Sequence, residues 1–166
     1  MLDIVLVGTQ LNKEGLYKRR QYIYSNRVSL KSNMAYIMLR HAKMSPVRPP
    51  TSAAPTVRVL DMFCGSGTIL LEAADWFGPG GGLLEAVGLD VSQGAVDGAA
   101  ENAAAEGPEV AGLCTFMKCD AKAIRSRKGQ SPELQEVLRD ESFDAICSNV
   151  SPLNACSQPG WSNPFQ

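Results

Sequence analysis

Residues 57–70 read VRVLDMFCGSGTIL, and this stretch decides the fold class of the chain. Its β-branched start predicts a strand over 57–61, and the apolar spacing that follows predicts a helix over 66–77. Between the two, Gly65 and Gly67 let the backbone turn sharply and come close to a ligand. The first N–H groups of the helix would face that ligand. A strand, a glycine turn and a helix together predict the first unit of a parallel sheet.

The same pattern of strand and helix recurs downstream. We expect further strands at 83–90, 110–117 and 143–149. We also expect a helix that starts at Ser92 or Asp97 and ends at Glu106, a helix at 132–139, and a polar loop or short helix at 118–131. Strands that alternate with helices predict an α/β fold with a parallel sheet and helices on both faces.

Length and composition bound the possibilities further. The 166 residues, 45% of them hydrophobic, suit one domain with a packed core. No apolar run approaches the roughly 18 residues of a membrane span. Five cysteines without a CxxC pair indicate reduced thiols and no zinc site. We therefore expect no bound metal. The start, MLDIVLVG, lacks a secretory signal pattern, so we expect a cytoplasmic or nuclear protein.

The net charge of −1 hides a split. Residues 1–50 carry nine Lys/Arg against two acidic residues, whereas the remainder carries seven basic and fifteen acidic residues. Basic residues alternate with aromatic ones around Lys18, Arg19 and Arg20, which is a pattern suited to RNA. The alternative is that these charges lie on a solvated surface or pair with the acidic part of the chain.

We interpret residues 1–50 as a basic connector, followed by a proline-rich linker at 51–56. Strands are expected at 3–8 and 16–28, and a helix is expected over 30–42. Ser29 is the expected N-cap of that helix. Its predicted buried face consists of Leu30, Met34, Ile37, Met38 and His41.

Acidic side chains end two of the predicted strands and follow a third. Asp61, Asp90 and Asp120 would meet at the carboxyl edge of the sheet, where open α/β folds bind ligands. Leu70 stands where a dinucleotide fingerprint has its third glycine, which disfavours a nicotinamide-dependent oxidoreductase, and no Lys-Ser/Thr pair forms a phosphate loop. The set suits a ligand with an amine, a ribose and an adenine but no phosphate, namely S-adenosylmethionine.

The segment VLDMFCGSGTILLEAA resembles motif I of class I S-adenosylmethionine-dependent methyltransferases. It is most similar to the THUMP-domain-containing RNA (guanine-N2) methyltransferases, and VGLDVSQGAVDGAAENAAAEG and FMKCDA resemble motifs II and III of that branch. The resemblance implies a Rossmann-like core at 57–150 and methylation of a guanine exocyclic amine in RNA, with tRNA as the first candidate.

The resemblance also implies roles for individual residues. Asp61, Gly65 and Gly67 would line the methionine end of the cofactor, with Phe63 and Ser66 as its wall. Asp90 would hold the ribose, and Asp120 and Ala121 would flank the adenine. Cys147 is expected to be a core residue, which favours nitrogen over carbon methylation.

Motif IV departs from the family pattern. Asn149 and Pro152 are the candidate catalytic residues, but Val150 replaces the first proline and no aromatic residue follows. Four predicted strands, in the order 3-2-1-4, and an irregular tail at 151–166 make the core incomplete at its C-terminus, so a protein partner could complete it. Two functions remain open, namely an RNA methyltransferase and a truncated, non-catalytic module that binds cofactor, RNA or protein.

Overall fold

The computed structural model describes most of the chain beyond residue 20. The described residues are 15, 18, 20–25, 29–42, 44, 57–78, 84–126, 130–139 and 142–150. The expected strand at 3–8, the linker at 51–56 and the tail at 151–166 lie outside them. Within the described part, no helix has the length and apolar character needed to cross a bilayer.

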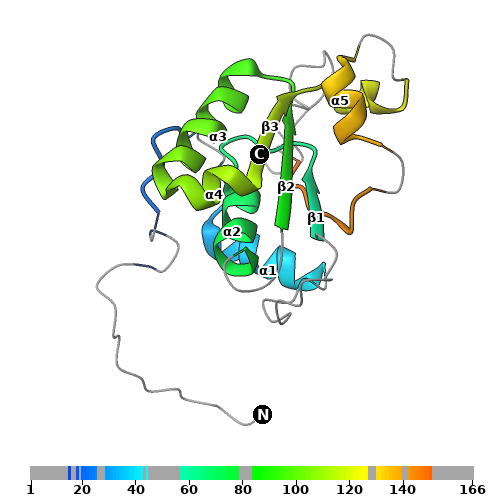
Figure 1. The fold of residues 1–166 in the computed structure, drawn as a ribbon. Coiled ribbons are helices and arrows are strands. Elements are labelled where there is room, and N and C mark those ends of the chain that lie inside the picture. The colour runs from blue at the N-terminus through cyan, green and yellow to red at the C-terminus, as the bar shows by residue number, and fades with distance from the viewer. Residues whose placement is uncertain are drawn as a thin grey trace, which may run out of the picture.

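A four-stranded sheet forms the centre of the molecule (Figure 1). Its strands are β1 (Val57–Asp61), β2 (Leu84–Asp90), β3 (Cys114–Lys118) and β4 (Ala145–Ile146). All neighbouring strands are parallel, in the order β3-β2-β1-β4, which confirms the predicted fold class and strand order. Because the strands are parallel, their carboxyl ends share one edge of the sheet.

Helices cover both faces of this sheet (Figure 1). The helical elements are α1 (Ser32–His41), α2 (Thr68–Phe77), α3 (Gln93–Glu106), α4 (Pro108–Leu113), the 3-10 helix η2 (Ala121–Ser126) and α5 (Pro132–Val137). Helices α1 to α4 lie on one face, and α5 lies on the other.

Successive strand residues enter two separate hydrophobic clusters, as alternation along a strand requires. Val59 joins the cluster under α1 and α2, whereas Leu60 joins the cluster under α5. On β2, Ala86 joins the cluster under α1 and α2, and Val87 joins the cluster under α5. Both faces of the sheet are therefore buried, as in other parallel sheets.

Three predicted strands differ from the structure. The strand expected at 143–149 is reduced to β4 at Ala145–Ile146. Residues 20–25, within the expected strand 16–28, contain no strand. The expected strand 110–117 begins as helix α4 and becomes β3 only at Cys114. Gly107 adopts a φ of +114° and Pro108 occupies the first turn of α4, where proline favours helix initiation.

Helix α1 forms where expected but buries a different face. Its buried residues are Ser32, Ala35 and Leu39, whereas Met34 and Ile37 are each 45% exposed. The predicted face was therefore wrong at Met34, Ile37 and the exposed His41, whereas Leu30 and Met38 are half-buried and pack against the core. Small residues at Ser32 and Ala35 let α1 approach α2 closely, and a spacing rule based on large apolar residues overlooks such a face. The expected cap was also wrong, because the N-cap is Lys31.

Candidate cofactor site

The turn between β1 and α2 has the backbone that its glycines predict. Gly65 and Gly67 have φ values of +53° and +81°, which lie in the left-handed region that favours glycine. A Cβ on Gly67 would also lie 3.2 Å from the Phe116 ring. The turn is closed by a 2.8 Å hydrogen bond from the Gly67 N–H to the Cys64 carbonyl. Backbone conformation thus favours glycine at position 67, and the nearby Phe116 ring leaves little room for a side chain.

Asp61 ends β1 beneath this turn and is only 1% exposed. Its carboxylate accepts a 3.0 Å hydrogen bond from the Phe63 N–H. Burial raises the pKa of Asp61 to about 7, and the charge of Asp90 adds to this rise. Hydrogen bonds from the Phe63 N–H and the Ser148 hydroxyl act in the opposite direction on this pKa. Asp61 is therefore a buried acid poised to titrate near neutral pH.

Asp90, at the end of β2, holds the other side of the turn. One carboxylate oxygen accepts from the Gly65 N–H at 3.0 Å, and the other accepts from the Ser92 N–H at 2.9 Å. A carboxylate has about four acceptor sites, so each oxygen keeps capacity for another donor. The half-buried Asp90 can therefore accept two hydroxyl groups of a ligand while it anchors the turn.

The end of β4 brings motif IV to the same edge of the sheet. The Cys147 N–H donates to the Leu60 carbonyl at 2.9 Å, which places the next residue beside the end of β1. Ser148 then accepts a 2.8 Å hydrogen bond from the Met62 N–H. Asn149 follows, half-buried. Sequence reasoning missed Ser148, whose only signal was a polar residue at the end of an apolar strand.

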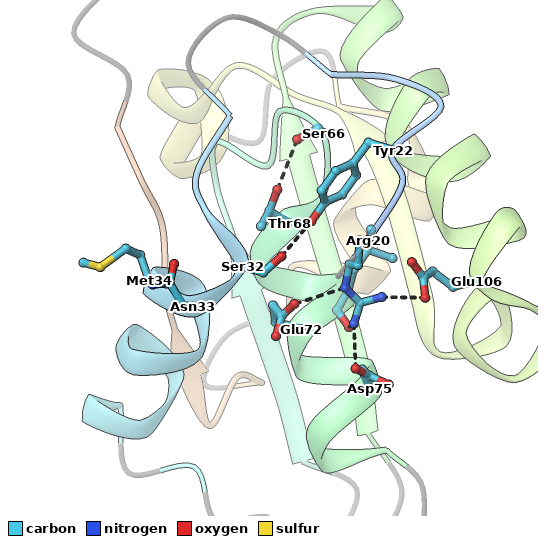
Figure 2. A network of polar contacts seen from close by, with 11 residues as sticks. Arg20, Tyr22, Ser32, Asn33, Met34, Ser66, Thr68, Glu72, Asp75 and Glu106 are labelled. Atoms are coloured by element: carbon cyan, nitrogen blue, oxygen red, sulfur yellow. Dashed lines mark hydrogen bonds and ion pairs between the residues drawn. The ribbon is translucent and has the colours of Figure 1, made fainter. Parts of the chain in front are cut away.

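The remaining predicted cofactor residues lie around this centre. Asp120 is exposed, and its carboxylate accepts from the Lys122 N–H at 2.9 Å, so it caps the start of η2. Ala121 begins η2 and is half-buried, as is Phe63 in the turn. Ser66 is buried, with its hydroxyl 3.2 Å from that of Thr68 (Figure 2). The cofactor roles of all these residues stay predictions, and Pro152 lies outside the described residues.

The position of Arg20 differs from the prediction that this residue contacts RNA. Its side chain is only 3% exposed and pairs with Glu72 at 3.0 Å, Asp75 at 2.9 Å and Glu106 at 2.7 Å (Figure 2). An arginine enclosed by three carboxylates cannot contact RNA, so its assignment to RNA was wrong. Lys18 is exposed, and Arg19 lies outside the described residues.

The described cysteines are free thiols. Burial raises the pKa of Cys147 to about 11, and the Asp61 charge adds to the effect. Cys147 also belongs to the hydrophobic cluster under α1 and α2, which confirms its interpretation as a core residue. Among the described residues, no three His, Cys, Asp or Glu side chains gather as metal ligands would.

Comparison with protein families gives one match. Residues 54–160 match the family described as "Methyltransferase domain". The chain belongs to this family. Family membership implies that S-adenosylmethionine is the methyl donor. The residues around the glycine turn fit that molecule, because the carboxylates of Asp61 and Asp90 can accept hydrogen bonds from an amine and from ribose hydroxyls.

The methyltransferase domain is also similar to parts of solved structures. TrmN from Thermus thermophilus is 33% identical over 61% of this chain and 26% of its own, with a TM-score of 0.46. YjhP from E. coli is 24% identical over 63% and 34% of the two chains, with a TM-score of 0.39. The glycopeptide N-methyltransferase MtfA, complexed with sinefungin, is 17% identical over 75% and 39%, with a TM-score of 0.46.

This chain therefore spans between about a quarter and two fifths of the length of these three proteins. A search of curated proteins found no match.

Proposed function

We propose that this methyltransferase domain transfers a methyl group from S-adenosylmethionine to the exocyclic amine of guanine in RNA, with tRNA as the first candidate. The observation that carries the proposal is the joining of Gly65 to Asp90 by a 3.0 Å hydrogen bond, beside the buried Asp61. This arrangement puts a ribose-type acceptor and a glycine turn at the carboxyl edge of the sheet, where α/β folds bind nucleosides.

The cofactor would contact residues from three strand ends. Asp61 and the glycine turn would receive the methionine end, with Phe63 and Ser66 beside it. Asp90 would accept the ribose hydroxyls. Asp120 and Ala121 would flank the adenine, a role that the exposed position of Asp120 leaves open to a ligand. When bound, S-adenosylmethionine supplies an electrophilic methyl group.

Asn149 would position the target amine. Its side-chain oxygen would accept a hydrogen from the amine and so direct the nitrogen lone pair toward the methyl group. Positioning of this kind can supply much of a rate enhancement, because the reactants no longer lose orientational freedom in the transition state. The Ser148–Met62 hydrogen bond supports this role, since it fixes the backbone just before Asn149. A guanine in a paired region would first have to leave its stack.

The resemblance of motifs I to III and the excess of Lys/Arg in residues 1–50 support RNA as the substrate. Lys18 is exposed and could contact a phosphate. Arg20 has no part in this contact because it is enclosed by carboxylates.

One observation favours a non-catalytic alternative. Val150 follows Asn149 and is 63% exposed, at a position where the family motif has a proline. A domain that has lost base positioning there could still bind cofactor. It would then serve as a cofactor-binding or interaction module.

Calorimetry with S-adenosylmethionine tests the site. We expect the wild type to bind and Asp90→Ala to bind at least about tenfold more weakly, because hydrogen bonds to a charged group contribute roughly 1.5–3 kcal/mol each. Asp97→Ala is the matched control, since Asp97 is an exposed acid on α3 that accepts from Gln93. Absence of binding by the wild type would contradict the proposed cofactor site.

Transfer of labelled methyl from the cofactor to bulk tRNA then separates the two functions. An active enzyme transfers label, and Asn149→Ala reduces the rate while the cofactor still binds. Cofactor binding without transfer to any RNA would favour the non-catalytic module.

A further inference from the structure

A buried amide on α3 lies between two parts of the chain that are distant in sequence. Asn102 is only 2% exposed. Its Oδ1 accepts from the Tyr24 N–H at 2.9 Å, and its Nδ2 donates to the Tyr24 carbonyl at 2.8 Å and to the Ser66 carbonyl at 3.0 Å. Both amide hydrogens are therefore used, one toward each segment. A single side chain thus joins residues 20–25 to the glycine turn.

The contact on the Tyr24 side is tightly fitted. Gly98 lies one helical turn before Asn102 on α3, and a Cβ at that position would overlap the Tyr24 side chain. The absence of a side chain at Gly98 thus lets Tyr24 settle against the helix, within reach of the amide. Arg20 anchors the same segment through its ion pair with Glu106 at the end of α3.

The contact on the Ser66 side acts on the turn itself. The Ser66 carbonyl lies between Gly65 and Gly67, both in the left-handed region, so its direction depends on the conformation of the turn. A second link runs from Ser29 to the Ser66 hydroxyl at 3.1 Å. The segment upstream of α1 is therefore linked to Ser66 in two ways. Tyr24 is linked to the Ser66 carbonyl through Asn102, and Ser29 contacts the Ser66 hydroxyl directly.

We propose that Asn102 is a positioning residue that couples the docking of residues 20–25 to cofactor binding at the glycine turn. This inference rests on the proposed cofactor site. When residues 20–25 are docked, Asn102 holds the Ser66 carbonyl in the orientation shown, and the turn is ready for the ligand. Without the Tyr24 contacts, the amide would lose two of its three partners and would hold the turn less firmly. By reciprocity, bound cofactor strengthens the docking of residues 20–25.

Two variants test the coupling from opposite sides. Asn102→Asp keeps the size of the side chain but replaces its donors with a carboxylate oxygen that faces two carbonyls. Gly98→Ala displaces Tyr24 without touching the turn. We expect each variant to bind S-adenosylmethionine roughly tenfold more weakly by calorimetry, which corresponds to about one lost buried hydrogen bond. Glu101→Gln, an equally small change at an exposed position of α3, should bind like the wild type.

Hydrogen exchange supplies a readout that a purely structural role would not move. In the wild type, saturating S-adenosylmethionine should slow exchange of the Tyr24 amide, which donates to Asn102, by a larger factor than it slows exchange of the Leu134 amide on α5. The Leu134 amide donates to Ser131 and reports the general stabilisation that any bound ligand gives. This measurement needs no variant, so it stands even if a substitution prevents folding.

The outcomes are distinguishable. If the wild type does not bind, the proposed function fails. If the wild type binds, either of two results overturns the coupling while the cofactor site stands. One is that cofactor slows Tyr24 exchange no more than Leu134 exchange. The other is that Asn102→Asp and Gly98→Ala bind S-adenosylmethionine within twofold of the wild-type affinity.

Discussion

Asp61 shows how one buried carboxylate can make stability depend on pH. Its pKa rises from 3.8 to about 7 on folding, mainly because burial disfavours the charged form. Between these two values the folded protein holds a proton that the unfolded chain has released. Stability is therefore highest below about pH 4 as far as Asp61 is concerned, and it falls as pH rises toward 7.

We predict that Asp61→Asn removes this component of the pH dependence. The amide oxygen can still accept from the Phe63 N–H, and no charge has to be buried. At pH 8 the variant should be more stable than the wild type by about 4 kcal/mol, and the two should converge near pH 4. Urea unfolding at both pH values measures this. A constant difference between the two proteins would show that Asp61 does not titrate in this range.

At the scale of elements, α1 shows that a sequence can predict a helix without predicting which of its faces is buried. The helix was predictable because its length and spacing are local properties. Its face was not, because the spacings of three and four residues fit two overlapping stripes. The structure buries the stripe that contains Ala35 and Leu39, since α2 lies against it.

We predict that substitutions on α1 distinguish these two faces. Leu39→Ala should destabilise the protein by about 2–5 kcal/mol, because Leu39 is fully buried. Met34→Ala, at a position that is 45% exposed, should change the free energy of unfolding by less than about 0.5 kcal/mol. Thermal or urea unfolding gives both values. A larger loss for Met34→Ala would restore the face that the sequence pattern predicted.

In the sheet and the site, too, features formed by contiguous residues were predictable, whereas contacts between residues far apart in the sequence were not. The unit from β1 to α2 was predictable because glycines, strand and helix are contiguous. Asp61 and Asp90 were predictable as neighbours because parallel strands end at one edge. Ser148 was not, because its contact with Met62 joins positions 86 apart. Helix α4 was not predicted, because Gly107 both ends α3 and precedes the first residue of α4, and nothing in the sequence separates these two roles.

At the scale of the whole molecule, Arg20 ties the basic N-terminal part to the acidic remainder. Glu72 is fully buried on α2, and its ion pair with Arg20 bridges 52 positions. Such a pair is costly to break, because removal of one partner leaves a buried charge without compensation. The opposite charges of the two parts therefore meet inside the molecule at this point.

We predict that Arg20→Met lowers the free energy of unfolding by about 3–5 kcal/mol, and that adding Glu72→Leu recovers much of this loss. Arg139→Met is the control, since Arg139 is 59% exposed in its pair with Glu136 and should contribute less than about 1 kcal/mol. Denaturant unfolding of the wild type, Arg20→Met, Glu72→Leu and the double variant measures the coupling between the two residues. Equal losses for Arg20→Met and Arg139→Met would argue that the buried pair adds nothing to stability.

The place of Arg20 also bears on how this protein can be cut for laboratory work. A fragment that starts at β1, where the sheet begins, would keep Glu72, Asp75 and Glu106 but lose the cation between them. It would also expose the surface of α2 that α1 covers. We expect such a fragment to aggregate, or to fold only at low pH, where the three carboxylates are protonated. A fragment that retains Arg20 and α1 keeps both the charge balance and the buried surface.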